Sequence, residues 1–162
     1  MELTPGRKGA IAETAIAAEA VALGLDVYRP VSEGGRYDLI IDTGPRLFRV
    51  QCKWAALRGD VVVIGSRTSR LTPRGYVRTT YSAAEIDGVA AHCAALQRSF
   101  WLPIHLVERQ GLVHLRLRPA RNGQQQGLKW AAQYPLGAIA QLGERVTGSH
   151  EVAGSSPASS ID

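Results

Sequence analysis

Three polar side chains whose types suit phosphodiester hydrolysis lie in one short part of the sequence: Asp38, Gln51 and Lys53. Such hydrolysis needs a divalent cation that neutralises the phosphate and lowers the pKa of an attacking water. Asp38 would bind the cation, and the side-chain oxygen of Gln51 would be a weaker ligand, which suits Mg²⁺ because this ion keeps several waters. The Lys53 ammonium would orient the water and offset charge that develops in the transition state. These residues therefore predict a Mg²⁺-dependent site.

A β-hairpin over residues 37–53 would bring the three side chains together. Its expected parts are a strand that ends at residue 42, a turn rich in Gly and Pro over residues 43–46, and a returning strand over residues 47–54. With a four-residue turn, antiparallel register places Asp38 opposite Gln51. Side chains alternate along a strand, so Asp38, Gln51 and Lys53 share one face. The opposite face of the returning strand is expected to enter the core through Phe48, Val50 and Cys52.

A helix expected over residues 9–23 offers a further acidic side chain, Glu13. Alanine and leucine favour a helix here, Gly24 is expected to end it, and an apolar stripe continues through Ile16, Ala20 and Leu23. If this helix packs on the sheet beside the hairpin, Glu13 reaches the same site. Two alternatives stay open: Glu13 is a solvated residue of an Ala-rich helix, and the polar residues of the hairpin form an ordinary solvated strand face.

The middle of the chain is expected to alternate between strands and helices. Leu25–Pro30 reads as a short edge strand, ended by its proline. Val61–Ile64 consists of β-branched residues and predicts a strand buried on both faces. Ser82–Arg98 is predicted to be a helix, because Ser82 and Glu85 form a capping-box pattern ahead of an apolar stripe.

The C-terminal third is expected to begin with a second hairpin, formed by Phe100–Val107 and Leu112–Arg118. A short helix over Leu128–Tyr134 should follow. From residue 135 the sequence is rich in Gly, Ser and Ala and has weak periodicity, with a low-complexity stretch at residues 154–160. The predicted organisation is one domain over residues 1–134 and a flexible tail over residues 135–162.

The charge of the chain favours an anionic partner. It has 19 Lys and Arg against 14 Asp and Glu, a formal net charge of +5, and this makes nucleic acid the first candidate. No acidic residue occurs between Val61 and Ala84, where an extended basic loop is expected to carry Arg67, Arg70, Arg74 and Arg78. Arginine binds phosphates and is the commonest bidentate partner of guanine, so we expect these residues to contact DNA. Two arginines of a later strand, Arg116 and Arg118, are further candidates. A solvated basic surface is the alternative for both groups.

Other kinds of site are disfavoured by the same sequence. The four histidines have no Cys/His spacing typical of zinc sites. The two cysteines lie in apolar patterns, so reduced core thiols are expected. No stretch is long and apolar enough to predict a membrane span, and the first residues lack a signal-peptide pattern. We therefore expect a cytoplasmic protein with no membrane partner.

The order of these features resembles the PD-(D/E)xK nuclease superfamily: a helix with Glu13, a strand with Asp38, a strand with Gln51 and Lys53, and then a helix. More specifically, it resembles group I intron-encoded homing endonucleases in which Gln replaces the usual acidic residue. The resemblance runs over about residues 5–134 and implies an α/β, restriction-endonuclease-like core in αβββαβ order, with a mixed central sheet flanked by helices. It also implies cleavage of double-stranded DNA with Mg²⁺. Two positions depart from the superfamily pattern: Tyr37 stands where the name places Pro, and Gln51 stands at the (D/E) position.

Residues 138–160 resemble the accidental translation of the 3′ part of a bacterial tRNA gene. A reading frame inside a tRNA-gene intron that runs into the downstream exon would produce such a sequence, and the target would then be the intronless tRNA gene. The alternative is an ordinary disordered extension. Because one site cuts one strand, double-strand cleavage implies at least a homodimer, and the resemblance also allows a homotetramer.

Two other functions remain open at this stage. A structure-selective nuclease, such as a Holliday-junction resolvase, would use the same residues. A non-catalytic DNA-binding module is the other alternative, because an amide at Gln51 weakens the metal site.

Overall fold

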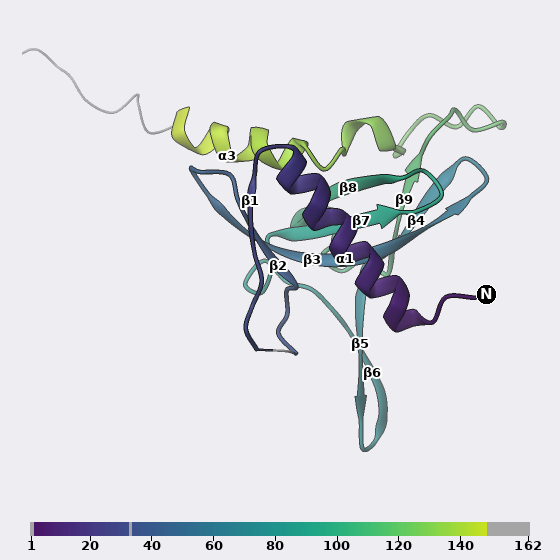
Figure 1. Ribbon diagram of the computed structural model, residues 1–162. Coiled ribbons are helices and arrows are strands. Elements are labelled where there is room, and N and C mark those ends of the chain that lie inside the picture. The colour runs from purple at the N-terminus through teal and green to yellow at the C-terminus, as the bar shows by residue number, and fades with distance from the viewer. Residues whose placement is uncertain (1, 33, 149–162) are drawn as a thin grey trace, which may run out of the picture.

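The computed structural model describes residues 2–32 and 34–148 of the chain. Figure 1 shows a central sheet with helix α1 across one face and helix α3 beside it. The sheet follows the order β1-β2-β3-β4-β9-β10, while β7 pairs with β3 and β8 pairs with β7. Parallel and antiparallel pairs both occur. The predicted fold class, a mixed central sheet flanked by helices, is confirmed.

The helical elements are α1 (Pro5–Ala22), α2 (Ile104–Val107), the 3₁₀ helix η1 (Ala131–Gln133) and α3 (Ala138–Gly148). The strands of the central sheet are β1 (Asp26–Tyr28), β2 (Leu39–Asp42), β3 (Leu47–Arg58), β4 (Val61–Gly65), β7 (Gly88–Cys93), β8 (Arg98–Pro103), β9 (Leu112–Arg116) and β10 (Lys129–Trp130). Two further strands, β5 (Arg67–Thr72) and β6 (Gly75–Thr80), form a separate two-stranded sheet. Within the described residues, no helix is long and apolar enough to cross a membrane.

Helix α1 forms where the sequence predicts it and begins four residues earlier. The Thr4 side chain caps its first turn by accepting a hydrogen bond from the Arg7 N–H at 3.3 Å, and Pro5 suits the first helical position. The buried stripe consists of Ala12, Ile16 and Ala20. Leu23, predicted to continue this stripe, is instead 50% exposed at the C-cap. Gly24 ends the helix with a positive φ of 81°, a conformation in which glycine has no Cβ penalty.

The β2–β3 hairpin has the predicted register. Asp42 pairs with Leu47 and Ile40 with Arg49, and the Gly44 N–H closes the turn by donating to Asp42 Oδ1 at 2.7 Å. Asp42 therefore has a structural role at the turn. The core-facing residues of the returning strand, Phe48, Val50 and Cys52, are buried as predicted.

Strand β3 is 12 residues long and belongs to two parts of the sheet. Its first part pairs with β2 and, in parallel, with β7. Its last part pairs with β4, which in turn pairs with β9. One buried cluster lies under α1 and α3, and the other lies where β4 and β9 pack over β7 and β8. Because β3 passes along both clusters, its side chains are fixed from two sides.

The helix predicted over Ser82–Arg98 is wrong. Ser82 and Glu85 do make the capping contact, with the Ser82 N–H donating to Glu85 Oε2 at 3.1 Å, but the chain then extends into β7 and β8. All six residues of β7 are buried, because the strand lies between β3 and β8 and both of its faces are covered. An apolar run of this length fits a buried strand as well as a buried helix. A Cβ at Gly88 would lie 2.5 Å from the Leu102 carbonyl oxygen, so only glycine fits there.

Three other predictions about strands also need correction. Strand β9 pairs with β4 rather than with β8, because α2 redirects the chain between them. Strand β4 is buried on one face only, through Val62 and Ile64, and its other face is partly exposed. The helix predicted over Leu128–Tyr134 is the short strand β10 followed by the 3₁₀ helix η1.

The predicted basic loop is a β-hairpin. Strands β5 and β6 pair antiparallel from Arg67 opposite Thr80 to Thr72 opposite Gly75. Figure 1 shows this hairpin projecting away from the central sheet.

The flexible tail predicted from residue 135 is wrong for residues 135–148. Leu136 and Ile139 are fully buried in the cluster under α1, and helix α3 begins at Ala138. Gly143 of α3 lies so close to Thr43 of the β2–β3 turn that a Cβ there would overlap the threonine side chain. The low-complexity stretch at residues 154–160 lies outside the described residues.

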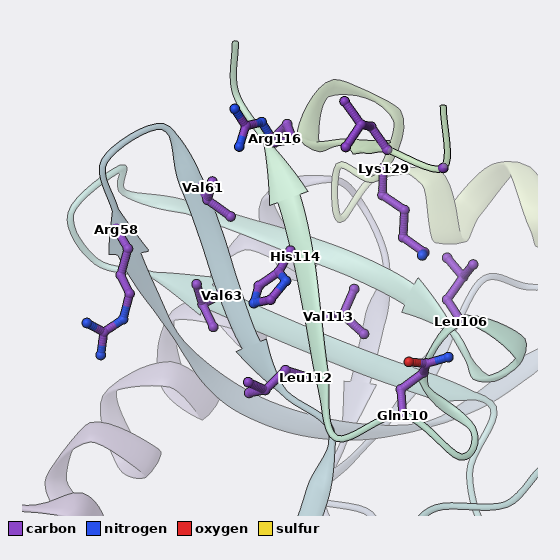
Figure 2. A pocket seen from close by; sticks show the side chains of 12 residues that line it. Arg58, Val61, Val63, Leu106, Gln110, Leu112, Val113, His114, Arg116 and Lys129 are labelled. Atoms are coloured by element: carbon purple, nitrogen blue, oxygen red, sulfur yellow. The ribbon is translucent and has the colours of Figure 1, made fainter. Parts of the chain in front are cut away.

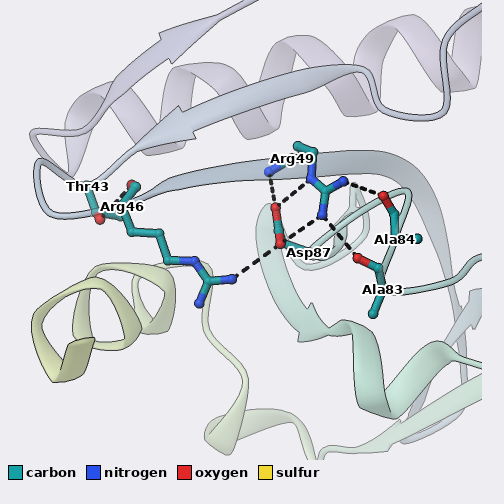
Figure 3. A network of polar contacts seen from close by, with 6 residues as sticks. All are labelled: Thr43, Arg46, Arg49, Ala83, Ala84 and Asp87. Carbon is teal, nitrogen blue, oxygen red and sulfur yellow. Dashed lines mark hydrogen bonds and ion pairs between the residues drawn. The ribbon is translucent and has the colours of Figure 1, made fainter. Parts of the chain in front are cut away.

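A polar network around Asp87 ties the start of β7 to β3 (Figure 3). Asp87 Oδ2 accepts hydrogen bonds from the Arg49 backbone N–H at 2.7 Å and from Arg49 Nε at 3.1 Å, and Oδ1 accepts from Arg46 Nη2 at 3.3 Å. The Arg49 guanidinium also donates to the carbonyl oxygens of Ala83 and Ala84. Partial burial by itself would raise the pKa of Asp87, but the hydrogen bonds and positive charges of Arg49 and Arg46 outweigh it and lower this pKa.

We expect Asp87→Asn to lower the free energy of unfolding at neutral pH by about 1–3 kcal/mol, because it removes hydrogen bonds to charged groups. A carboxyl whose pKa is lowered by folding stabilises the protein above its unfolded-state pKa, and this contribution is lost as the pH falls through the folded-state pKa. The difference in the free energy of unfolding between the variant and the wild type should therefore become smaller at acidic pH. Urea denaturation at several pH values measures it, with the exposed Glu108→Gln as control. If Asp87→Asn were as stable as the wild type at neutral pH, the stabilising role of the Asp87 network would be contradicted.

Candidate active site

Asp38 and Gln51 meet in the structure as predicted. Asp38 directly precedes β2, and its backbone N–H donates to the Val50 carbonyl oxygen at 2.9 Å, which extends the hairpin pairing beyond β2. Its Oδ2 accepts hydrogen bonds from Gln51 Nε2 at 2.5 Å and from the Cys52 backbone N–H at 2.8 Å. The amide nitrogen of Gln51 thus faces Asp38, and the amide oxygen Oε1 is the atom with which Gln51 can bind a cation.

The carboxyl of Asp38 lies in a partly desolvated position. Burial raises its pKa above the ordinary value of 3.8. The hydrogen bond from Cys52, the positive charge of Lys53 and the hydrogen bond from Gln51 act in the opposite direction but do not outweigh burial. A buried carboxyl of this kind gains from a nearby cation, since the cation favours its charged form.

Lys53 shares the strand face of Gln51, but its ammonium is held by other groups. Lys53 Nζ donates to the Arg67 carbonyl oxygen at 3.3 Å and lies 5.3 Å from the centre of the Tyr81 ring. It is close enough to lower the pKa of Asp38 by its charge. Lys53 therefore joins the site to the base of the β5–β6 hairpin, a contact that the sequence did not predict.

Glu13 and Asp38 line the same surface hollow, whose volume is about 430 Å³. Glu13 approaches from α1, and Tyr37 and the loop before it complete the wall. Glu13 Oε1 makes an ion pair with Arg29 Nη2 at 3.3 Å, and both side chains are partly exposed. This partner could not be predicted from the sequence, because Arg29 is a single arginine directly after the edge strand β1.

The candidate donors are oxygen atoms: the carboxylates of Asp38 and Glu13, which line the hollow, and the amide oxygen of Gln51, whose amide nitrogen contacts Asp38. Such donors suit a hard divalent cation that keeps part of its water shell. Among residues 2–32 and 34–148, no three side chains of the His, Cys, Asp and Glu types converge as a metal cage. The side-chain types of Asp38, Glu13 and Gln51 are those that bind hard divalent cations.

Cys52 lies between the two carboxyls but points into the core. Burial, with the negative charges of Asp38 and Glu13, strongly raises the pKa of its thiol. Both effects favour the protonated thiol over the reactive thiolate.

The arginines predicted to contact DNA fall into two groups. Arg67 and Arg70 lie on β5, Arg78 lies on β6, and Arg74 is exposed at the tip between the strands. Arg67 and Arg78 share one face of the hairpin, since Arg67 pairs with Thr80 and Ser69 with Arg78.

The second group lies on and just after β9. Arg116 Nε donates to the Arg118 carbonyl oxygen at 3.4 Å. Arg118 Nε lies 3.9 Å from Asp60 Oδ1, a weak contact between exposed side chains. These contacts of Arg116 and Arg118 involve no residue of the hairpin.

Comparison with known proteins gives a family and a related fold. The sequence profile described as PD-(D/E)XK endonuclease matches residues 4–137. No curated protein sequence matches the chain. Among solved structures, the chain is similar to one titled as the structure of a bacterial homing endonuclease, I-Ssp6803I. The TM-score is 0.69 at 24% sequence identity, over 90% of this chain and 97% of the other. At that identity, the likeness shows a shared fold.

We expect Asp38→Asn to raise the melting temperature at pH 7 by about 2–4 °C. A carboxyl whose pKa is raised by folding stabilises the protein below its unfolded-state pKa, and this is lost as the pH rises through the folded-state pKa. At neutral pH the ionised Asp38 therefore destabilises the folded protein, and a neutral amide at this position removes that effect. The rise in melting temperature should vanish near pH 4, where Asp38 is protonated in the wild type. Thermal denaturation across this range measures the effect, with the exposed Asp26→Asn as the matched control. A less stable variant at pH 7 would contradict this electrostatic account.

Proposed function

The chain belongs to the PD-(D/E)XK endonuclease family, and on this basis we propose that it is a metal-dependent, site-specific DNA endonuclease of the homing type. One observation carries the proposal: the Gln51 amide holds the Asp38 carboxyl on the strand face that also presents Lys53. The fold shared with a bacterial homing endonuclease supports it.

Asp38, Gln51 Oε1 and Glu13 would hold the cation in this proposal, with Mg²⁺ as the expected ion. When bound, the cation supplies charge neutralisation at the phosphate and a more acidic attacking water. Gln51 and the Cys52 backbone N–H orient the carboxyl of Asp38 through its Oδ2. Lys53 contributes a positive charge toward the developing negative charge and orients the water. Glu13 must exchange its ion pair with Arg29 for the cation.

The β5–β6 hairpin is the proposed DNA-reading element. A two-stranded antiparallel ribbon fits the major groove of B-form DNA. The segment between Val61 and Ala84 has no acidic residue, so all of its charges favour contact with phosphates and guanine edges. The proposed DNA contacts are Arg67, Arg70, Arg74 and Arg78 of the hairpin together with Arg116 and Arg118.

The biological setting that we propose is a group I intron in a tRNA gene, with the intronless gene as target. The support is the likeness of residues 138–160 to a translated tRNA gene. Helix α3 lies in this segment, and its Ile139 is buried. Cleavage of both strands requires at least two copies, so the proposed assembly is a homodimer or a homotetramer.

We expect Lys53→Ala to reduce DNA cleavage in Mg²⁺ by about 100-fold or more, because it removes the positive charge that, in this proposal, offsets the negative charge of the transition state. Binding of the same DNA should be almost unchanged. Single-turnover cleavage of a plasmid that carries the intronless tRNA gene measures the first quantity, and fluorescence anisotropy measures the second. Lys8→Ala on α1 is the control. Full cleavage by Lys53→Ala without any metal would refute the mechanism. If four-way junctions were cut in preference to this linear target, a structure-selective nuclease would be favoured.

We also expect titration with Mg²⁺ or Ca²⁺ to release heat in the wild-type protein and in Asp26→Asn, but not in Asp38→Asn. Asp38 is the carboxylate that anchors the proposed site, whereas Asp26 is exposed on the edge strand β1. Isothermal titration calorimetry without DNA measures this. Equal heats in all three proteins would contradict the assigned metal site, and no heat in any of them would favour a non-catalytic DNA-binding module.

A further inference from the structure

The outer face of the β4–β9 pair forms a hollow of about 540 Å³ (Figure 2). Strand alternation sends Val62 and Ile64 into the core and leaves Val61 and Val63 on the outer face. On β9, Leu112 and His114 face outward in the same way. This sheet face therefore presents aliphatic side chains, with Leu106 of α2 at its edge.

All fully charged side chains that line this hollow are cationic. They are Arg58 at the end of β3, Arg116 on β9 and Lys129 on β10, and His114 lies between them. No Asp or Glu belongs to the described lining. Positive charges beside an aliphatic wall attract an anion more strongly than the same charges on an open polar surface, because the wall excludes water from one side.

The hollow continues to the base of the β5–β6 hairpin. Leu112 also lines a second hollow, of about 490 Å³, whose charged residues are Arg67 and Arg78. The Arg67 guanidinium lies against the start of β9, since a Cβ at Gly111 would be 3.1 Å from it. Arg67 in turn accepts the hydrogen bond from Lys53 through its carbonyl oxygen. The two hollows, which share Leu112, thus form a cationic track from the base of the hairpin to Lys129.

We propose that this track, defined by Arg67, Arg78, Arg58, Arg116 and Lys129, binds the phosphate backbone of duplex DNA that flanks the cleaved position. The inference rests on the proposed nuclease function and extends it, because it adds Arg58 and Lys129 and places Arg116 in the same surface. A single-stranded partner is a poorer fit, since no Phe, Tyr or Trp lines either described hollow on which bases would stack. A second copy of the chain is a poorer fit too, because a symmetric contact would bring like charges together.

The test is the salt dependence of DNA binding by Arg58→Gln/Lys129→Gln. The matched control is Arg7→Gln/Lys8→Gln, which removes one arginine and one lysine from α1 on the opposite side of the sheet. Binding of a duplex of roughly 40 base pairs is followed by fluorescence anisotropy without divalent metal over a range of salt. We expect the slope of log K against log salt to fall by about two in the track variant, one for each lost phosphate contact, and to stay at the wild-type value in the control.

Cleavage of the same target in Mg²⁺ separates this inference from the function it rests on. The control variant should cut as the wild type does, whereas the track variant should need more protein for half-saturation. If wild type cuts but both variants keep the wild-type salt slope, the track is refuted and the nuclease function stands. A changed oligomeric mass in the track variant with an unchanged slope would also refute it and would mark an interface between copies. If wild type neither binds nor cuts any duplex, the proposed function fails and the track fails with it.

Discussion

The position of β7 beside β3 is the constraint on which the rest of the structure depends. A parallel pair has no tight turn to set its register, and here Asp87 sets it. Its carboxylate accepts hydrogen bonds from both the backbone and the side chain of Arg49, and the next residue, Gly88, then pairs with Val50. Gln51 and Lys53 follow directly on β3, so the register fixed by Asp87 also fixes the strand that carries the candidate site.

Asp38 and Asp87 show how partners decide the behaviour of partly buried carboxyls. Both are held by backbone and side-chain donors from β3. Asp87 faces the guanidinium groups of Arg49 and Arg46, and its pKa is lowered. Asp38 faces a neutral amide, and burial raises its pKa. The first arrangement favours the charged carboxyl in the folded protein, whereas in the second arrangement burial disfavours it.

The parts of the fold that local sequence determines were predictable. Turn length and side-chain alternation are enough to place Asp38 against Gln51 and to bury Phe48 on the other face. The predictions that were wrong concern elements whose structure depends on contacts with residues far away in the sequence. The apolar residues of β7 fit the periodicity of a buried helix as well as that of a buried strand. The pairing of β7 with β3 and β8 stabilises the extended backbone. The contacts of Lys53 with Arg67 and of Glu13 with Arg29 likewise depend on packing between elements, for which the sequence offers no periodic signal.

The parallel pairing of β3 with β7 also has a consequence for the order of folding. Val50 and Gly88 are neighbours in the sheet although β4, β5 and β6 all lie between them in the chain. The hairpins β2–β3 and β5–β6 need only short loops and can close early, whereas the β3–β7 pair must first lose the entropy of a long loop. The support that β7 gives to the strand of Gln51 and Lys53 therefore costs more loop entropy than closing either hairpin.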